Sequence, residues 1–185
     1  EEAKGSQVSR TIGLDGAVTV ACGLCIAAAG VAMTLFLGKP LLDAHSFRQT
    51  QTAISAYYMA EDPGLFHRYV TPVLGKPWAI PMEVPFYQWL VARVHRLSGV
   101  ALDPSGKLVS AAFWLGCAFP MWLLLGGLDL SRSQRCLAGI VVFSSPLYLY
   151  WGRAFLIETT GLFFALAMVA CVVACYRSED WRWCL

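Results

Sequence analysis

The sequence predicts an all-α fold: a polytopic membrane helix bundle of about four transmembrane helices, with a large outer loop that carries short interfacial helices. The chain is 57% hydrophobic and only 14% charged, and its mean hydropathy of +0.56 lies outside the range of ordinary soluble domains. The charges are also unevenly placed, because long charge-free runs alternate with charged residues. A charge in the middle of a bilayer costs about 2.5–3.5 kcal/mol on insertion scales, so charges mark the ends of spans.

Four apolar runs supply the predicted spans, since about 20 apolar residues suffice to cross the hydrocarbon as a helix. The third run is short, but Arg135 and Arg153 at its ends can extend their charged heads toward water. A secretory signal peptide explains the first run poorly, because the run is long and more apolar runs follow it. The predicted transmembrane helices are residues 16–38, 107–128, 136–152 and 159–176.

The basic residues between these spans predict the orientation of the chain. With four spans, residues 1–15, 129–135 and 177–185 share one side, and the positive-inside rule assigns it to the cytoplasm. Residues 39–106 and 153–158 then face outward. We therefore expect an integral, multi-pass membrane protein whose large loop faces the periplasm, the cell exterior or a lumen. The sequence has no block of basic residues of the kind that binds nucleic acid, so nucleic acid is not expected as a partner. The residues behind this assignment are Lys4, Arg10, Arg132, Arg135, Arg177 and Arg182.

The outer loop is expected to form two short helices. Ser46 and Gln49 fit a capping box that opens the first, through about residue 60. Pro85 is well placed to start the second, over residues 86–97, which is too short and too polar to span and is predicted to lie along the membrane surface. The alternative is a fifth, tilted span there, which would reverse the orientation of everything after it. The apolar face of this helix is expected to consist of Phe86, Trp89, Leu90, Val94 and Leu97.

The cysteines are expected to be structural. All seven lie in predicted spans or their flanks. Cys22 and Cys25 have the spacing of a redox or metal motif. Within an apolar helix, however, cysteine behaves as a small hydrophobic residue, and no disulfide framework is predicted.

Polar residues gather where the first span ends, in the segment of residues 43–52. Carboxylates can act as a general base toward a hydroxyl or hold a divalent ion through oxygen, and arginine can neutralise phosphate. A site with both at a membrane surface indicates a phosphorylated lipid as substrate. On the predicted topology, one face of the membrane holds Asp43, His45, Arg48, Glu83 and Glu158.

Three motifs occur in order: an outer loop opening with Asp43, the segment of residues 83–90 (Glu-Val-Pro-Phe-Tyr-Gln-Trp-Leu), and residues 145–155 leading to Glu158. Together they resemble the N-terminal part of the GT-C glycosyltransferases, in the branch of protein O-mannosyltransferases and lipid A aminoarabinose transferases (family 39). The resemblance covers nearly the whole chain, from about residue 16 to residue 176.

The resemblance implies an integral enzyme of the bacterial plasma membrane, with its active site on the periplasmic or outer face. Such an enzyme takes a sugar from a polyprenyl-phosphate donor. The sugar would pass, with inversion, to a hydroxyl of a glycan, lipid or protein acceptor. Asp43 maps to the catalytic carboxylate, and a divalent ion (Mg²⁺ or Mn²⁺) would be held by His45 and Glu83. The predicted substrate-binding residues are Arg48, Gln49, Gln51, Glu83, Arg153 and Glu158.

The sequence departs from the family pattern at three positions. Ala44 replaces a second acidic residue, Val84 replaces a phosphate-binding lysine, and Glu158 stands where Asp is commoner. The first two substitutions put metal and phosphate ligation in question, and Lys76 or Arg48 would have to compensate.

Structural roles are the alternative for each candidate. Asp43 could cap a helix, Glu83 could cap the helix after Pro85, and Glu158 could pair with Arg153 at the end of a span. Because family members usually carry many more spans, we expect this chain to be a fragment or an N-terminal module. A non-catalytic membrane remnant or partner subunit that binds lipid-linked sugar is the second hypothesis. Transport is a third, disfavoured because the spans lack the interior charge pairs or broken helices that are expected of a substrate path.

Overall fold

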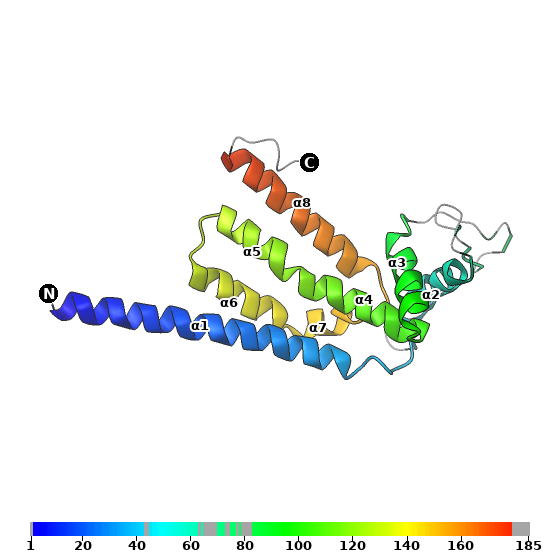
Figure 1. Ribbon diagram of the computed structural model, residues 1–185, viewed down its shortest axis with the longest axis horizontal. Coiled ribbons are helices and arrows are strands. Elements are labelled where there is room, and N and C mark those ends of the chain that lie inside the picture. The colour runs from blue at the N-terminus through cyan, green and yellow to red at the C-terminus, as the bar shows by residue number, and fades with distance from the viewer. Residues whose placement is uncertain are drawn as a thin grey trace. The chain divides into compact units, whose positions relative to one another are not determined.

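The computed structural model describes residues 2–42, 45–62, 64, 70–72, 75–76, 78 and 83–178. Within these residues every regular element is a helix, which confirms the predicted all-α fold class (Figure 1). The helices are α1 (Glu2–Thr34), α2 (Ser46–Glu61), α3 (Phe86–Ser98), α4 (Leu102–Gly116), α5 (Ala118–Gly127), α6 (Arg132–Phe143), α7 (Pro146–Gly152) and α8 (Glu158–Ser178).

Three helical segments of the described chain are long and apolar enough to cross a membrane, which identifies a membrane protein. They are Asp15–Thr34 in α1, Leu102–Gly127 in α4 and α5, and Glu158–Ser178 in α8. Each overlaps a predicted span. The second begins at Leu102 rather than at Lys107, because Pro104 is tolerated in the first turn of a helix and Lys107 is buried rather than placed at an edge.

The segment 136–152 is not the single helix that we expected. It contains α6, of 12 residues, and α7, of 7 residues, and each is too short to cross the hydrocarbon by itself. Pro146 causes the interruption, since it has no N–H to continue the hydrogen bonds of α6 and instead begins α7. Ser144 forms the C-cap of α6 and donates its N–H to Ile140 O.

The chain divides into two compact units. The first unit comprises Glu1–Ala32, Leu115–Leu149 and Phe163–Leu185, and the second unit comprises Met33–Trp114 and Tyr150–Leu162. Several helices therefore contribute residues to both units. Each unit has its own type of packing.

Small residues allow the helices of the first unit to approach closely. A Cβ added at Gly139 of α6 would lie 3.0 Å from the sulfur of Cys22 in α1, and one at Gly127 would lie 2.7 Å from Val173 in α8. Such small-residue contacts are typical of packing within membranes. Cys136 is buried, and the six described cysteines are free thiols.

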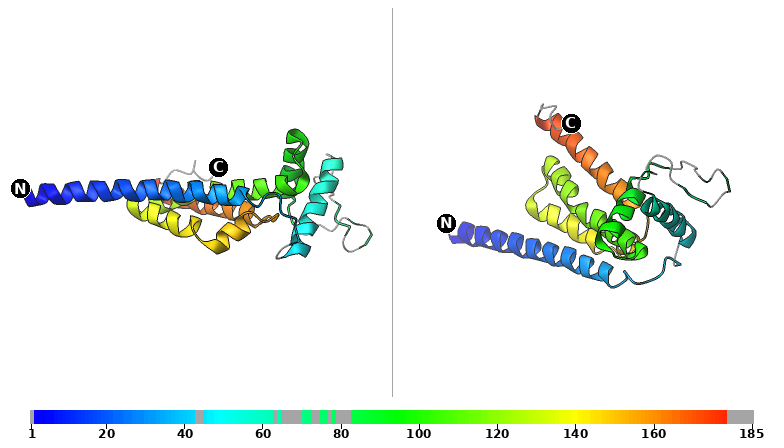
Figure 2. Two further views of the ribbon diagram at one scale, coloured as in Figure 1. Left: turned by 90° about the horizontal axis from the view of Figure 1, so that it is seen from below. Right: turned by 45° about the vertical axis from the view of Figure 1, so that its right-hand side comes forward.

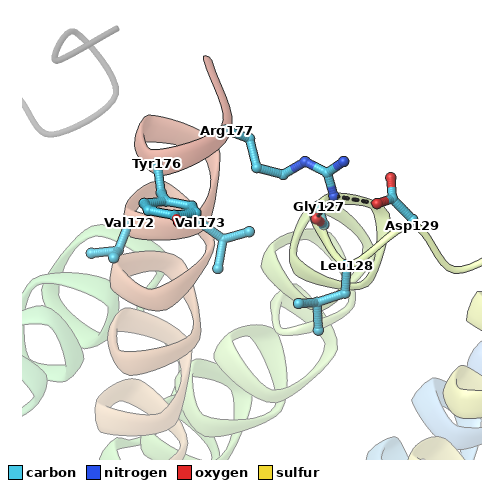
Figure 3. Close-up of a pocket in the computed structure, with 7 residues that line it drawn as sticks. All are labelled: Gly127, Leu128, Asp129, Val172, Val173, Tyr176 and Arg177. Carbon is cyan, nitrogen blue, oxygen red and sulfur yellow. Dashed lines mark hydrogen bonds and ion pairs between the residues drawn. The ribbon is translucent and has the colours of Figure 1, made fainter. Parts of the chain in front are cut away.

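The turn between α5 and α6 is held by side chains that bond to it. Ser131 and Gln134 form a capping box at the start of α6. Arg177, near the end of α8, forms an ion pair with Asp129 and also donates to the Gly127 carbonyl (Figure 3). The hydrogen bond from Arg177 to the Asp129 carboxylate lowers the pKa of that carboxyl below its usual value. The ion pair thus joins the last turn of α8 to the end of α5.

In the second unit, α2 and α3 lie side by side (Figure 2). Their apolar core also receives residues from α4 and from the segment that follows α7. The buried cluster consists of Leu41, Ala53, Ala56, Tyr87, Val91, Val109 and Phe155.

The residues that α3 buries within the protein lie mostly outside its predicted apolar face, and the predicted position along the membrane surface stays a prediction. Leu90 and Val94 pack against the core, but Leu97 is 86% exposed, and the fully buried residues are Tyr87, Gln88, Val91 and Ala92. Apolar spacing missed this face because Tyr87 and Gln88 are buried through hydrogen bonds. With 13 residues, α3 is too short for the alternative of a fifth span.

The predicted capping box of α2 is also wrong. The N-cap is His45, in a left-handed conformation with φ of 57°, and its side chain makes no capping hydrogen bond. The side chain of Gln49 bonds elsewhere, as described below.

Candidate functional site

The predicted catalytic residue Asp43 and its neighbour Ala44 lie outside the described residues. The role of Asp43 as a general base therefore stays a prediction. The other candidate residues are all described, and all of them belong to the second unit.

An ion pair joins two of the predicted substrate residues. Arg48 of α2 donates to Glu83 across 2.6 Å, and both side chains are mostly buried, at 32% and 17% exposure. The second carboxylate oxygen of Glu83 accepts from the Gln88 amide at 2.7 Å. Glu83 therefore binds side chains, while Pro85 occupies the N-cap position of α3 without a side-chain cap.

A small polar pocket of about 10 Å³, room for about one water-sized group, adjoins this ion pair. Four of its residues recur on α2 at the spacing that normally forms an apolar face: Arg48, Gln51, Thr52 and Ser55. Thr71 closes the pocket, and its hydroxyl lies 2.5 Å from the hydroxyl of Ser55. Sequence reasoning missed Thr52, Ser55, Thr71 and Gln88, although the helical spacing of polar residues in α2 was a signal that could have found the first two.

Gln88 contributes an unsatisfied acceptor to this pocket. Its side chain is 2% exposed, and its Oε1 has no hydrogen-bond partner in the structure. Buried polar groups are nearly always hydrogen-bonded, so each exception calls for an explanation. The hydroxyls of Thr159 and Thr160, at the start of α8, are buried without a partner as well.

Gln49 has a different position from Gln51. Its side chain is 1% exposed, and its Oε1 accepts a hydrogen bond from the backbone N–H of Phe155 at 3.0 Å. Gln49 does not line the polar pocket. It instead ties α2 to the segment between α7 and α8, where Arg153 and Glu158 lie.

Arg153 lies close to two aromatic rings. Its guanidinium carbon lies 4.1 Å from the ring centre of Phe36 and 4.9 Å from that of Tyr150. Next to Tyr150, Trp151 makes an edge contact with His45, with 5.0 Å between ring centres. We name this group of Phe36, His45, Tyr150, Trp151 and Arg153 the arginine–aromatic cluster.

The alternative of an Arg153–Glu158 ion pair is not supported. The ion pairs found among the described side chains are Arg48–Glu83 and Arg177–Asp129. Glu158 is exposed at the first turn of α8. Its carboxylate and the Arg153 guanidinium are therefore each left without a counter-charge in the described part of the chain.

A buried hydrogen-bond network supports the site. The Tyr87 hydroxyl donates to the Gly106 carbonyl at 2.8 Å, and Ser110 lies 2.8 Å from the phenol oxygen and 3.2 Å from the Leu156 carbonyl. Burial raises the pKa of the Tyr87 phenol, and the nearby Glu158 carboxylate raises it further. The neutral phenol therefore persists at alkaline pH.

Lys107 satisfies backbone groups that follow α1. Its ammonium donates to the carbonyls of Phe36 and Lys39, although we had predicted Lys107 at a membrane edge. Both carbonyls lie past the end of α1, and the Phe36 carbonyl also accepts from the Lys39 N–H at 3.2 Å. Lys107 thereby holds the segment that leads toward residue 43.

The proposed metal ligands are not gathered among the described residues. No group of three His, Cys, Asp or Glu side chains able to hold a metal occurs in the ranges that the structure describes. His45 contacts Trp151, and Glu83 bonds Arg48 and Gln88. Metal ligation by His45 and Glu83 stays a prediction.

No protein-family model matches the sequence, and neither a curated protein nor a solved structure is significantly similar to it. Membership of the GT-C glycosyltransferases therefore stays a prediction from the sequence motifs.

Proposed function

We propose that this chain is a membrane glycosyltransferase, or the N-terminal portion of one, that uses a polyprenyl-phosphate sugar. The observation that carries the proposal is that Arg48, Gln51 and Glu83 line one polar pocket. The same unit holds Arg153, next to the end of an apolar helix that is long enough to cross a membrane. A lipid-linked sugar requires this combination of a polar site and adjacent apolar helices.

Burial of polar groups supports a binding role for the second unit. Every polar or charged residue that is buried in the described chain lies in this unit. Burying a polar group costs free energy unless it is hydrogen-bonded, so a purely structural loop would be expected to bury apolar residues instead.

The charges suggest a division of roles between the two arginines. Glu83 balances the charge of Arg48, whereas Arg153 has no acidic partner among the described residues. Two aromatic rings contact the Arg153 guanidinium, which is half-buried, and its N–H groups are suited to a bidentate contact with phosphate. We therefore assign the donor phosphate to Arg153, where the sequence alone favoured Arg48.

In the reaction, Asp43 takes the proton of the acceptor hydroxyl as that oxygen forms a bond with the anomeric carbon of the sugar. The bond from this carbon to the phosphate oxygen breaks on the opposite face, and the polyprenyl phosphate leaves with its electrons. Arg153 stabilises the charge on the departing phosphate. A bound Mg²⁺ or Mn²⁺ would supply further charge stabilisation.

We propose a multi-pass topology in which α6 and α7 together form an interrupted span. In the first unit, Arg135 near the start of α6 lies beside Gly126 of α5. In the second unit, residues that follow α7 lie beside Gly106 of α4. Helices of 12 and 7 residues measure about 28 Å together at the usual rise, close to the thickness of the hydrocarbon.

A non-catalytic subunit that binds lipid-linked sugar is the second candidate. The Arg48–Glu83 ion pair favours this candidate, because Glu83 is engaged with Arg48 and Asp43 is then the sole proposed catalytic base. The two candidates differ in turnover: the Asp43→Asn substitution abolishes transfer in an enzyme but leaves the only activity of a binding subunit intact.

Binding of radiolabelled polyprenyl-phosphate sugars to the membrane-reconstituted chain tests the proposal, with and without Mg²⁺ or Mn²⁺. We expect saturable binding that Arg153→Gln weakens about tenfold, the scale of a charge-assisted hydrogen bond. Arg96→Gln is the matched control, because Arg96 is an exposed arginine of the same unit. Absence of saturable binding by a folded, inserted chain would overturn the proposal.

A further inference from the structure

We propose that the pocket beside the Arg48–Glu83 ion pair receives a single uncharged hydroxyl of the sugar and thereby selects among sugars, with Gln88 Oε1 as its acceptor. This inference rests on the proposed function and deepens it. It separates recognition of the sugar from recognition of the phosphate, which is assigned to Arg153.

The orientation of the Gln88 amide follows from its neighbour. Its nitrogen must face Glu83, because the carboxylate accepts and cannot donate a hydrogen bond at neutral pH. The Gln88 Nε2 to Glu83 Oε1 distance of 2.7 Å agrees with this orientation. Oε1 is therefore left as the acceptor without a partner, on a side chain that lines the pocket and is 2% exposed.

The charge of the pocket favours a neutral ligand. Arg48 and Glu83 cancel, and the remaining lining residues are hydroxyls and amides. A phosphate placed here would meet the Glu83 carboxylate and an amide oxygen, both of which repel it. A hydroxyl can instead donate to Gln88 Oε1 and accept from the Arg48 guanidinium, which has five N–H donors.

The size of the pocket limits what can enter it. Sites for whole small molecules usually measure about 300–1,000 Å³, whereas this pocket measures about 10 Å³, which is room for about one water-sized group. It therefore accommodates one substituent of a sugar ring rather than the ring itself. Such a pocket discriminates strongly, because a sugar that lacks the hydroxyl leaves the buried acceptor without a partner.

The experiment uses short-chain prenyl phosphates that carry different monosaccharides, with the membrane-reconstituted full chain. For the sugar that binds most tightly, binding of each monodeoxy analogue is compared in wild type, in Gln88→Met and in Gln134→Met. Methionine keeps the length of the side chain and removes its amide. Gln134 is a matched control because it is a glutamine that caps α6 in the first unit.

We expect one monodeoxy analogue to bind wild type and Gln134→Met about tenfold more weakly than the parent sugar, and Gln88→Met to bind both alike. Equal binding of all analogues by wild type, or discrimination that survives in Gln88→Met, overturns the pocket assignment and leaves the proposed function standing. Prenyl phosphate without a sugar that binds as tightly as the parent compound would also overturn the pocket assignment and leave the proposed function standing. If no probe binds to the folded chain, the proposed function fails and this inference fails with it. The wild-type series decides the matter if Gln88→Met does not fold.

Discussion

The two units of this protein bury different kinds of residue. In the described part of the first unit, the buried residues are apolar side chains, glycine, proline and cysteine, such as Ala29, Cys117, Cys136 and Phe143. In the second unit, buried glutamines, serines and threonines accompany the apolar core. The first composition suits helices surrounded by lipid, which need only close packing with one another. The second is that of a built polar site, in which the positions of hydrogen-bonding groups are specified.

The two ion pairs show the same contrast. Arg177–Asp129 of the first unit joins side chains that are 44% and 76% exposed, whereas Arg48–Glu83 joins side chains at 32% and 17%. An exposed pair contributes little to stability, but a buried charge that loses its partner costs much more. The contrast can be tested by substitutions that are matched between the units.

Removing a buried ring of the second unit should have the largest effect. Phe155 is completely buried against Tyr87, with 5.8 Å between ring centres. We expect Phe155→Ala to lower the free energy of unfolding by about 3–5 kcal/mol. Phe164→Ala, at a 51% exposed position of the first unit, should change it far less. Thermal unfolding in detergent measures both, and equal losses would remove the distinction between the units.

Overpacking the same core should rank next. A Cβ at Gly106 would lie 2.1 Å from a ring carbon of Phe155, so Gly106→Ala should destabilise the protein by about 1–3 kcal/mol. At Gly23 of the first unit no atom lies within 4 Å of the added Cβ, and Gly23→Ala should raise helix stability by up to about 1 kcal/mol. Chemical denaturation in mixed micelles compares the two, and a stable Gly106→Ala variant would contradict the close approach.

Breaking the ion pairs one at a time should sharpen the comparison. Glu83→Gln leaves Arg48 without a counter-charge in a mostly buried site, and we expect a loss of about 1–3 kcal/mol in unfolding free energy. Asp129→Asn should leave the melting temperature nearly unchanged, because the pair is exposed and solvent screens it. A larger shift for Asp129→Asn than for Glu83→Gln would reverse the ranking of the two pairs.

The smallest expected effect is a loss of folding stability at alkaline pH. The pKa of the Tyr87 phenol is raised in the folded state by burial, whereas in the unfolded chain it ionises near pH 10. Its contribution to stability is therefore complete below about pH 10 and declines as the pH rises further. Melting temperatures of wild type and Tyr87→Phe between neutral and alkaline pH check this. The fall in melting temperature at alkaline pH should be smaller in Tyr87→Phe than in wild type. If the melting temperature falls equally with pH in both proteins, Tyr87 is not the source of the loss.

The positions of the outer-loop helices in the chain could be predicted from the sequence. The residues that these helices bury within the protein could not. Pro85 marked the start of α3 correctly, because proline fixes a backbone torsion suited to a first turn. The apolar stripe that included Leu97 did not indicate which residues pack within the protein, since the buried position of Tyr87 depends on the Gly106 carbonyl and the Ser110 hydroxyl, which come from another helix. No periodicity within α3 contains that information.

The sequence by itself determined the membrane character, the all-α class and the approximate positions of three apolar helical segments, because hydrophobicity and helix signals are properties of contiguous residues. It also named Arg48, Gln51 and Glu83 as candidates. Only the tertiary structure decided that Glu83 neutralises Arg48, that Gln49 bonds Phe155, and that Gln88 carries an unsatisfied acceptor. These facts depend on distances between residues far apart in the chain, which packing creates and local sequence does not encode.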